Sequence, residues 1–263
     1  MSSGLRAGES ASEQCAGSTL ALRRGRLVWH VCAAAAVRLP EWLTRQEREP
    51  TAARILKEAP GRRVLAAEGW VLKWSAPRQP SARWRFGLQP SAARRAFRLA
   101  LELLRAGVPT AQPVAWATRR SGGLRREDFL ITEELAGTEM LSARLHRYMA
   151  SPAERVETLT ALGHLAGALH RAGFTNRDLK DANLLCSRGE PLRIWVTDLD
   201  GVRRWARVPA RRAAADLGPL CHSLRCHGWL RDAGDAAALL AAYNARTQPR
   251  LQRRTLGNTG RGP

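Results

Sequence analysis

The chain has 263 residues, of which 44% are apolar, so it can bury a core as one bilobal domain or as two small ones, and disorder is not the default. Its formal net charge of +20 and pI of about 11.5 favour an anionic partner such as nucleic acid, a phospholipid surface or an acidic glycolipid. Five cysteines without a C-x-x-C pair argue against a secreted disulfide framework and favour the cytoplasm.

Residues 1–50 are expected to form an N-terminal extension, polar at first and then carrying a short apolar element at 27–37. A membrane-spanning helix needs roughly 18 to 20 apolar residues, whereas LVWHVCAAAAV is shorter and contains His30. The pattern therefore favours a helix or strand packed on the domain over a membrane anchor.

Residues 51–135 begin with three strand-like runs, RILKEA, RRVLAAEG and WVLKWS. Turn signals at Pro60-Gly61 and around Gly69 separate these runs, which predicts an antiparallel meander. Lys73 lies on the third of the three expected strands.

The same segment continues with one expected helix and a hairpin. Residues 91–106 have helical spacing of apolar side chains, with Ser91 as a cap and Gly107 as a stop. The apolar runs PVAWATRR and EDFLITEEL flank SGG and predict a hairpin. Residues 51–135 are thus predicted to form a small antiparallel sheet with one helix inserted after its third strand.

The second half of the chain, residues 136–250, is expected to be mainly helical. Helices are predicted at 153–172, 214–227 and 233–245, and LRIWVTDLD reads as a buried strand that ends in carboxylates. The remainder, 251–263, is expected to be a basic flexible tail. These elements predict an α+β fold of two lobes.

The stretch HRAGFTNRDLKDANLL carries the chemistry. Asp178 and Asn183 are spaced as in D-L-x-x-x-N, the catalytic-loop pattern of protein kinases, and Asp198 ends the next expected strand, where a metal-binding aspartate belongs. Upstream, VLK at 71–73 matches the lysine of the third kinase strand.

Phosphoryl transfer requires these residue types together, because it builds negative charge that must be positioned and neutralised. Asp178 would orient the acceptor hydroxyl and take its proton, and Asn183 and Asp198 would hold Mg²⁺. Lys73 would bind the α and β phosphates of the nucleotide, and Lys180 would lie beside the γ phosphate. The chain has three lysines among 43 basic residues. Two of the three, Lys73 and Lys180, fall where a compact ammonium is needed.

An isolated NRDLKDAN is more often a solvated turn whose side chains bond the nearby backbone. The combination of an upstream strand lysine, a preceding helix and a following DLD strand favours the catalytic interpretation. Asp200 is either a second metal ligand or a cap on the next turn, and Asp216 is either a brace for the catalytic loop or a helix N-cap.

Together, HRAGFTNRDLKDANLL and WVTDLDGVRR resemble the lipopolysaccharide kinase family, the Kdo and heptose kinases, within the protein-kinase-like superfamily. The resemblance covers about residues 54–245 and is strongest at 165–204. It implies a bilobal protein-kinase-like fold, with an antiparallel-sheet N-lobe at 51–135 and a helical C-lobe at 136–250.

The resemblance also implies the site and its ligands. The family's catalytic aspartate would be Asp178, next to Lys180, which the chemistry above already places among the catalytic residues, and ATP would be bound with Mg²⁺. The nucleotide-binding residues would be Lys73, Asn183, Asp198 and the backbone of an interlobe hinge near Glu133 and Leu135; the metal ligands would be Asn183 and Asp198.

Departures from the kinase pattern leave a pseudokinase scaffold as an alternative. The helix glutamate that pairs with Lys73 is expected near Ala96, but the only acid in that helix, Glu102, is six residues on and about 120° round. No G-x-G-x-x-G precedes Lys73, and Asn176 stands where kinases often have histidine.

The acceptor is expected to be an anionic glycolipid or phosphosugar. The segment from Asp198 to Asp216 is short and lacks A-P-E, which argues against a Ser/Thr protein kinase. Residues 78–126 have a net charge of +10 and residues 201–263 of +9, which is either a solvated face or a surface for phosphorylated sugars and the anionic inner leaflet. A nucleic-acid-binding module would explain the charge, but no RNP, KH or zinc-finger pattern is present. The expected location is therefore cytoplasmic, with peripheral contact at the inner face of the cell membrane.

Overall fold

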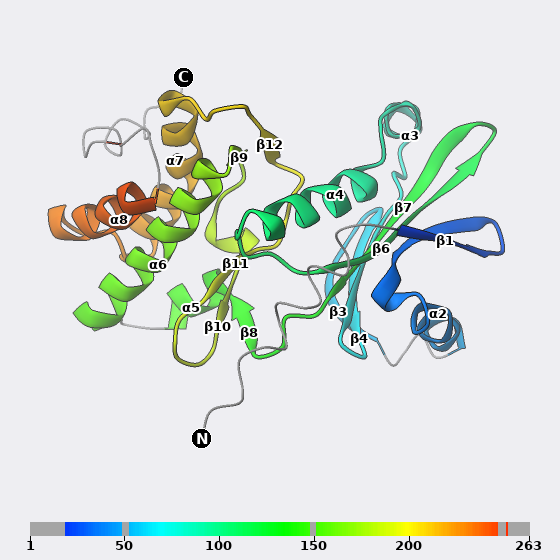
Figure 1. Ribbon diagram of the computed structural model, residues 1–263, viewed down its shortest axis with the longest axis horizontal. Helices are drawn as coiled ribbons and strands as arrows, with labels where there is room; N and C mark the ends of the chain where they lie inside the picture. The colour runs from blue at the N-terminus through cyan, green and yellow to red at the C-terminus, as the bar shows by residue number, and fades with distance from the viewer. Residues whose placement is uncertain (1–18, 49–52, 148–150, 247–250, 252–263) are drawn as a thin grey trace. The chain divides into compact units, whose positions relative to one another are not determined.

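The computed structural model describes residues 19–48, 53–147, 151–246 and 251 (Figure 1). Two compact units divide the chain: the first holds the residues up to Arg105 and Ala111–Ala136, and the second holds Ala106–Thr110 and the residues from Gly137 onward. Apart from Leu251, the expected tail at 251–263 lies outside the described residues.

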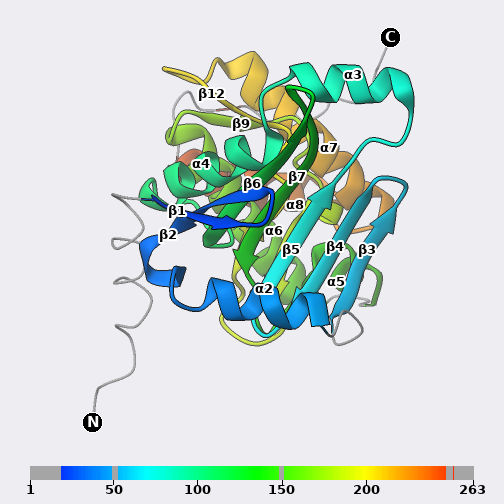
Figure 2. The ribbon, with the colours of Figure 1, turned by 90° about the vertical axis from the view of Figure 1, so that its right-hand side faces the viewer.

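The first unit is built on an antiparallel sheet of seven strands in the order β1-β2-β6-β7-β5-β4-β3 (Figure 2). The strands are β1 Thr19–Arg24, β2 Leu27–Cys32, β3 Arg54–Ala59, β4 Arg62–Ala67, β5 Trp70–Ser75, β6 Pro113–Ser121 and β7 Leu124–Glu133. Its helices are α2 Leu39–Arg48, α3 Pro80–Leu88 and α4 Ala92–Arg105, with a short 3-10 turn at Ala33–Ala35.

The predicted meander and hairpin are confirmed. Strands β3, β4 and β5 pair in sequence, and β6 and β7 form the hairpin around Gly122 and Gly123. Helix α4 begins where it was predicted, because the Ser91 hydroxyl accepts a hydrogen bond from the Arg94 N–H at 3.1 Å. Gly107, just after the helix, has a φ of +72°, the left-handed conformation that glycine adopts at little cost.

The part of the expected N-terminal extension that the structure describes, residues 19–48, packs on the domain as two strands and a helix, which confirms the interpretation favoured over a membrane anchor. Strand β2 pairs with β6, so β1 and β2 widen the sheet on that side. A two-residue turn at Gly25-Arg26 joins these two strands, and Gly25 has a φ of +57°. The polar, glycine-containing turn between LALRR and LVWHVC was a hairpin signal that the interpretation as an extension overlooked.

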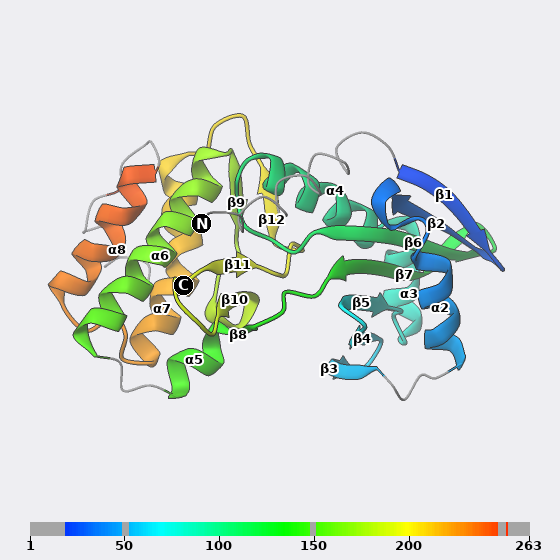
Figure 3. The ribbon, with the colours of Figure 1, turned by 60° about the horizontal axis from the view of Figure 1, so that its bottom comes forward.

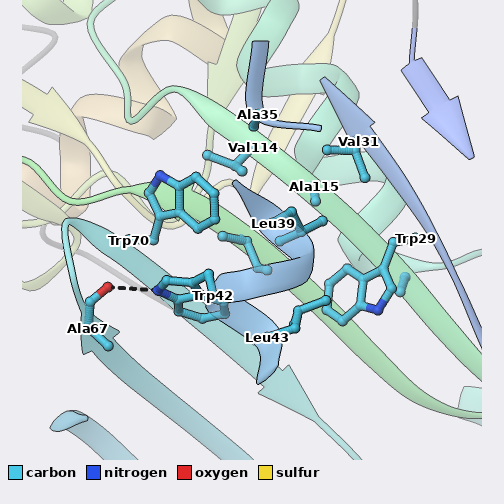
Figure 4. Close-up of a cluster of buried hydrophobic side chains, with 12 residues drawn as sticks. Trp29, Val31, Ala35, Leu39, Trp42, Leu43, Ala67, Trp70, Val114 and Ala115 are labelled. Carbon is cyan, nitrogen blue, oxygen red and sulfur yellow. Dashed lines mark hydrogen bonds between the residues drawn. The ribbon is translucent and has the colours of Figure 1, made fainter. Parts of the chain in front are cut away.

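Alternating side chains give the sheet two apolar faces. On one face, α2 inserts Leu39, Trp42 and Leu43 against the sheet, and the Trp42 indole N–H donates to the Ala67 carbonyl at 3.1 Å (Figure 4). On the other face, Phe97 of α4 packs with Cys32, and the half-buried side chains there are Leu101, Trp116 and Leu130.

Within residues 53–135 the structure describes two helices, α3 and α4, where one was expected. Helix α3 precedes α4, and its apolar residues point in opposite directions, since Phe86 is half-buried while Trp84 and Leu88 are exposed. That pattern lacks a single apolar stripe, so helical periodicity did not reveal it.

A buried ion pair fixes the start of α4 and the end of α3. The guanidinium of Arg125, 2% exposed, is bonded to the Asp128 carboxylate and donates to the carbonyls of Phe86 at 2.7 Å, Gln89 at 3.1 Å and Pro90 at 3.2 Å. Asp128 in turn accepts from the Ser91 hydroxyl and from the first backbone N–H groups of α4. Burial lowers the pKa of Arg125, and the adjacent Asp128 opposes that shift.

The second unit is mainly helical, as predicted (Figure 3). Its helices are α5 Leu141–Arg147, α6 Pro152–Arg171, α7 Ala210–Cys226 and α8 Ala233–Arg246, and its 3-10 turn η3 spans Asp181–Asn183. The strands are β8 Thr138–Met140, β10 Leu184–Ser187 and β11 Ile194–Val196 in one sheet, and β9 Phe174–Asn176 with β12 Val202–Arg204 in another. The α+β fold class, with an antiparallel sheet and a helical second part, is therefore confirmed.

Two glycines allow α6 and α8 to pack closely. A Cβ atom on Gly163 would overlap the Leu239 carbonyl oxygen and lie 2.8 Å from the Ala242 Cβ atom. At Gly167 it would lie 2.6 Å from the Tyr243 carbonyl oxygen. The contacts are mostly with backbone, which cannot rotate away.

Gly163→Ala is expected to lower the free energy of unfolding by about 1–3 kcal/mol, as overpacking does in well-packed cores. Alanine is a better helix former than glycine by about 1 kcal/mol, but this gain is smaller than the cost of the overlap with backbone atoms of α8. Urea denaturation measures the change. Gly189→Ala is the control, because nothing lies within 4 Å of a Cβ atom there, and a Gly163→Ala protein as stable as this control would show that the two helices separate freely.

Candidate active site

The loop between β9 and η3 carries the predicted catalytic residues, and two short antiparallel ladders fix its ends. At one end, β9 pairs with β12, with Asn176 opposite Val202. At the other, β10 pairs with β11, with Leu184 opposite Val196. The backbone N–H of Thr197 donates to the Asn183 carbonyl at 3.1 Å and extends this second ladder. As a result, residues 176–183 lie against residues 197–202.

A buried aspartate braces the start of the loop. Asp216 lies inside α7 rather than at its N-cap, and its carboxylate accepts a hydrogen bond from the Asn176 backbone N–H. His170 at the end of α6 reaches the same carboxylate through Nε2 at 3.2 Å, and its Nδ1 lies 2.9 Å from the Tyr243 hydroxyl. Of the two interpretations left open for Asp216, the geometry therefore supports the brace.

Asp178 is half-buried and is held by its neighbours. Its backbone N–H donates to the Asn176 side-chain oxygen at 3.1 Å, and its carboxylate lies 3.6 Å from Nε of Arg177. Gly201 packs against it so closely that a Cβ atom there would lie 2.8 Å from the Asp178 carboxylate and 2.7 Å from the Asn176 side-chain oxygen. A larger residue at 201 would therefore displace the side chain that we expect to act as the base.

Asn183 and Asp198 both lie at the same end of the β10–β11 ladder. The Asn183 side-chain N–H₂ donates to the Asp178 carbonyl at 2.9 Å, which directs the amide oxygen of Asn183 away from that bond. One carboxylate oxygen of Asp198 accepts from the Asp200 N–H at 3.2 Å. The donors gathered here are an amide oxygen and carboxylates, a set that fits Mg²⁺ and not a soft metal. In the part of the chain that the structure describes, no three His, Cys, Asp or Glu side chains are grouped so as to hold a metal by themselves.

Lys180 and Asp181 point to different environments. Lys180 is exposed, and its carbonyl accepts from the Asn183 N–H at 2.9 Å, so it opens the 3-10 turn. Asp181 is only 8% exposed and lies 3.3 Å from Nε2 of His227, whose ring contacts His146 edge-on. The sequence interpretation missed His227, because 46 residues separate it from Asp181 and no local pattern links the two.

The other predicted residues lie in the first unit. Lys73 is on β5, paired with Leu130 of β7, and therefore on the face of the sheet that α4 covers. Glu133 ends β7, and its backbone N–H donates to the Gln112 carbonyl at 2.8 Å; Leu135 follows two residues later. Within the second unit the structure brings together Asp178, Lys180, Asn183 and Asp198.

The departures from the kinase pattern are visible in the first unit. Ala96 is buried in α4 and supplies no carboxylate where the helix glutamate was expected. The turn between β3 and β4 consists of Pro60 and Gly61, and the Gly61 carbonyl accepts from the Ala76 N–H at 2.8 Å. Gly61 has a φ of +75°, and a Cβ atom there would overlap the Ala76 carbonyl. This turn is thus fixed to the end of β5 and requires its glycine for that reason.

Residues 76–243, more than half of the 263 residues, match the model of the lipopolysaccharide kinase (Kdo/WaaP) family. The chain belongs to this family. The resemblance inferred from the catalytic-loop motifs is thereby confirmed, and the Kdo/WaaP match contains the loop, its bracing aspartate and the DLD strand.

Two relatives within the Kdo/WaaP family are similar to this chain. The lipopolysaccharide core heptose(I) kinase WaaP of Pseudomonas aeruginosa is 30% identical over 139 residues, which is 50% of this chain and 52% of the relative. This chain thus aligns with about half the length of that curated relative. A solved structure of WaaP in complex with acyl carrier protein has 26% sequence identity and a TM-score of 0.58, covering 76% of this chain and 82% of that one.

Proposed function

We propose that this member of the Kdo/WaaP family is a kinase that moves the γ-phosphate of ATP to a hydroxyl of an envelope glycolipid sugar. The observation that carries this proposal is the arrangement of Asp178, Asn183 and Asp198 around one loop. The family match and the similarity to the heptose kinase WaaP support the acceptor class.

Asp178 would orient the acceptor hydroxyl and accept its proton. It is half-buried beside Arg177, with its carboxylate 3.6 Å from Nε of that residue, and a carboxylate is the group that a base must supply. Three residues would keep that carboxylate in place. Gly201 packs against the side chains of Asn176 and Asp178, and Asp216 holds the backbone of Asn176. Lys180, exposed at the start of the 3-10 turn, would neutralise the charge on the transferred phosphate.

Asn183 and Asp198 would hold Mg²⁺, and Lys73 would bind the α and β phosphates. When bound, the metal neutralises charge on the nucleotide phosphates. Glu133 and Leu135 remain the residues proposed for the adenine, through their backbone. The amide oxygen of Asn183 and the carboxylate of Asp198 are hard donors, and they favour a metal-dependent nucleotide site.

The acceptor is proposed to be anionic because exposed arginines follow the site in the chain. Strand β12 pairs with β9, which leads into the catalytic loop, and it begins a run of exposed arginines between Gly201 and Asp216. These are Arg203, Arg204, Arg207, Arg211 and Arg212. A phosphorylated sugar or an anionic membrane surface would complement them.

A protein partner is a further candidate, because the solved WaaP structure contains acyl carrier protein. For the location we propose peripheral contact with the cytoplasmic face of the membrane, where an envelope glycolipid would be presented. Among the described residues, no helix is both long and apolar enough to cross a bilayer.

A pseudokinase scaffold is the second candidate function. It is favoured by Ala96 at the position of the helix glutamate and by the two-residue turn at Gly61, which stands in place of a glycine-rich loop. Labelled ATP, incubated with separate pools of glycolipid, protein and small sugars, distinguishes the two. We expect Mg²⁺-dependent labelling of the glycolipid pool and tighter ATP binding with Mg²⁺ than after chelation. Nucleotide binding without transfer to any pool would favour the scaffold.

A further inference from the structure

Helix α3 presents an apolar pair to solvent. Trp84 is 63% exposed and Leu88 is 73% exposed, and their spacing of four residues places both on one face of the helix. All nine tryptophans of the chain lie within the described residues, and the other eight are buried or half-buried. Trp84 is therefore exposed in a way that the other tryptophans are not.

The opposite face of α3 is anchored to the hairpin β6–β7. A Cβ atom on the buried Gly87 would lie 3.1 Å from the Leu124 Cβ atom, so the helix backbone rests directly on the hairpin. The Arg125 guanidinium lies 3.8 Å from the centre of the Phe86 ring and donates to the Phe86 carbonyl at 2.7 Å. Because Phe86 and Gly87 are fixed inward, Trp84 and Leu88 are held outward.

The surroundings of the pair are cationic. Residues 78–98 contain six arginines and no acidic residue. Arg83 and Arg85 are both exposed and flank Trp84 directly, and Arg78 precedes the helix. An exposed apolar pair of tryptophan and leucine among arginines is the composition of elements that lie in the interface of an anionic membrane.

We propose that α3 docks this protein on an anionic phospholipid bilayer, with Trp84 and Leu88 in the interfacial layer and the neighbouring arginines at the headgroup phosphates. The inference rests on the proposed function, in which the acceptor is a glycolipid presented by a membrane. It identifies α3 as the element through which the protein would reach that acceptor. No helix in the described ranges could span the membrane instead.

Other partners fit this surface less well. A specific protein interface buries about 800 Å² on each partner, more than two side chains on a nine-residue helix supply. Nucleic acid would engage the arginines and stack on Trp84, but Leu88 would gain nothing from a phosphate backbone. The bilayer interface accommodates the indole, the aliphatic side chain and the arginines together.

Sedimentation with vesicles, in the absence of ATP and of any glycolipid, tests the inference. The vesicles are phosphatidylcholine alone or phosphatidylcholine with phosphatidylglycerol. We expect wild type to bind the anionic vesicles and the double variant Trp84→Ser, Leu88→Ser to partition at least about tenfold less. Arg83→Gln with Arg85→Gln should weaken binding most at low salt, because added salt screens the headgroup attraction.

Val37→Ser is the control, since Val37 is 88% exposed in the same unit and its one adjacent cation, Arg38, lies over the Trp70 ring. It should partition as wild type does, and thermal melting should show that all variants remain folded. Equal partition of the Trp84→Ser, Leu88→Ser variant and wild type would overturn the proposal. The proposal would also be overturned if wild type did not sediment with the vesicles but bound an acidic protein, such as acyl carrier protein, through α3.

A second measurement separates this inference from the proposed function. Phosphate transfer to glycolipid dispersed in detergent should be equal for wild type and the α3 variants, whereas transfer to glycolipid in anionic vesicles should fall in the variants. Docking without any transfer by wild type would contradict the kinase proposal alone. Normal transfer with unchanged partition of the α3 variants would contradict the docking proposal alone.

Discussion

Replacing Asp178 by asparagine is expected to lower phosphate transfer by roughly 10² or more and to change nucleotide affinity by no more than a few-fold. The substitution preserves the volume of the side chain and most of its hydrogen bonding. It removes the carboxylate that would take the proton of the acceptor hydroxyl. Because the backbone N–H of residue 178 still donates to Asn176, the loop should keep its conformation.

Steady-state transfer and equilibrium binding of ATP, measured on the same preparations, check this expectation. Glu190→Gln is the control, since it removes one negative charge from an exposed residue of the same unit, outside the loop. Asp198→Asn should behave differently and should make nucleotide binding less dependent on Mg²⁺ as well as lowering transfer. Transfer by Asp178→Asn at the wild-type rate would refute the assignment of the base.

Replacing Arg125 by alanine is expected to lower the free energy of unfolding by about 3–5 kcal/mol, the cost of leaving a buried charge without its partner. The Asp128 carboxylate would remain buried, and the carbonyls of Phe86, Gln89 and Pro90 would lose their shared donor. Urea denaturation followed by tryptophan fluorescence measures the loss, since buried Trp29, Trp42 and Trp70 report on the first unit.

The neighbouring pair of Arg119 and Glu127 provides the control on the same hairpin. The Arg119 side chain is 48% exposed, so Arg119→Ala should cost less than about 1 kcal/mol. Combining Arg125→Leu with Asp128→Asn should recover part of the loss, because no unpaired charge remains. A cost for Arg125→Ala no larger than that of Arg119→Ala would show that the buried pair does not hold α3 and α4 in place.

The elements predicted best from sequence were those with a strong local pattern. Strand-like apolar runs in RRVLAAEG and WVLKWS, separated by turn signals, identified the meander, and the apolar spacing of 153–172 identified α6. The loop that we propose to be catalytic was recognisable because Asp178 and Asn183 lie five residues apart in one motif. For the meander, α6 and this loop, a pattern within one short stretch of sequence was sufficient.

The contacts that position the loop were beyond local reasoning. Strands β9 and β12 have three residues each, too few for an alternating pattern, yet their pairing places Gly201 against Asp178. The contact between Asp181 and His227, like the capping of α4 by Asp128, joins residues far apart in the sequence. Such side-chain pairs depend on the tertiary fold and leave no periodic trace.

Mass spectrometry of the intact glycolipid, incubated with Mg-ATP and this protein, tests the central claim most directly. With wild type, we expect a product whose mass has increased by one phosphate group, formed only when Mg²⁺ is present. With Asp178→Asn, the same incubation should leave the glycolipid almost unmodified. A glycolipid that gains no phosphate from wild-type protein, although the protein binds Mg-ATP, would contradict the account.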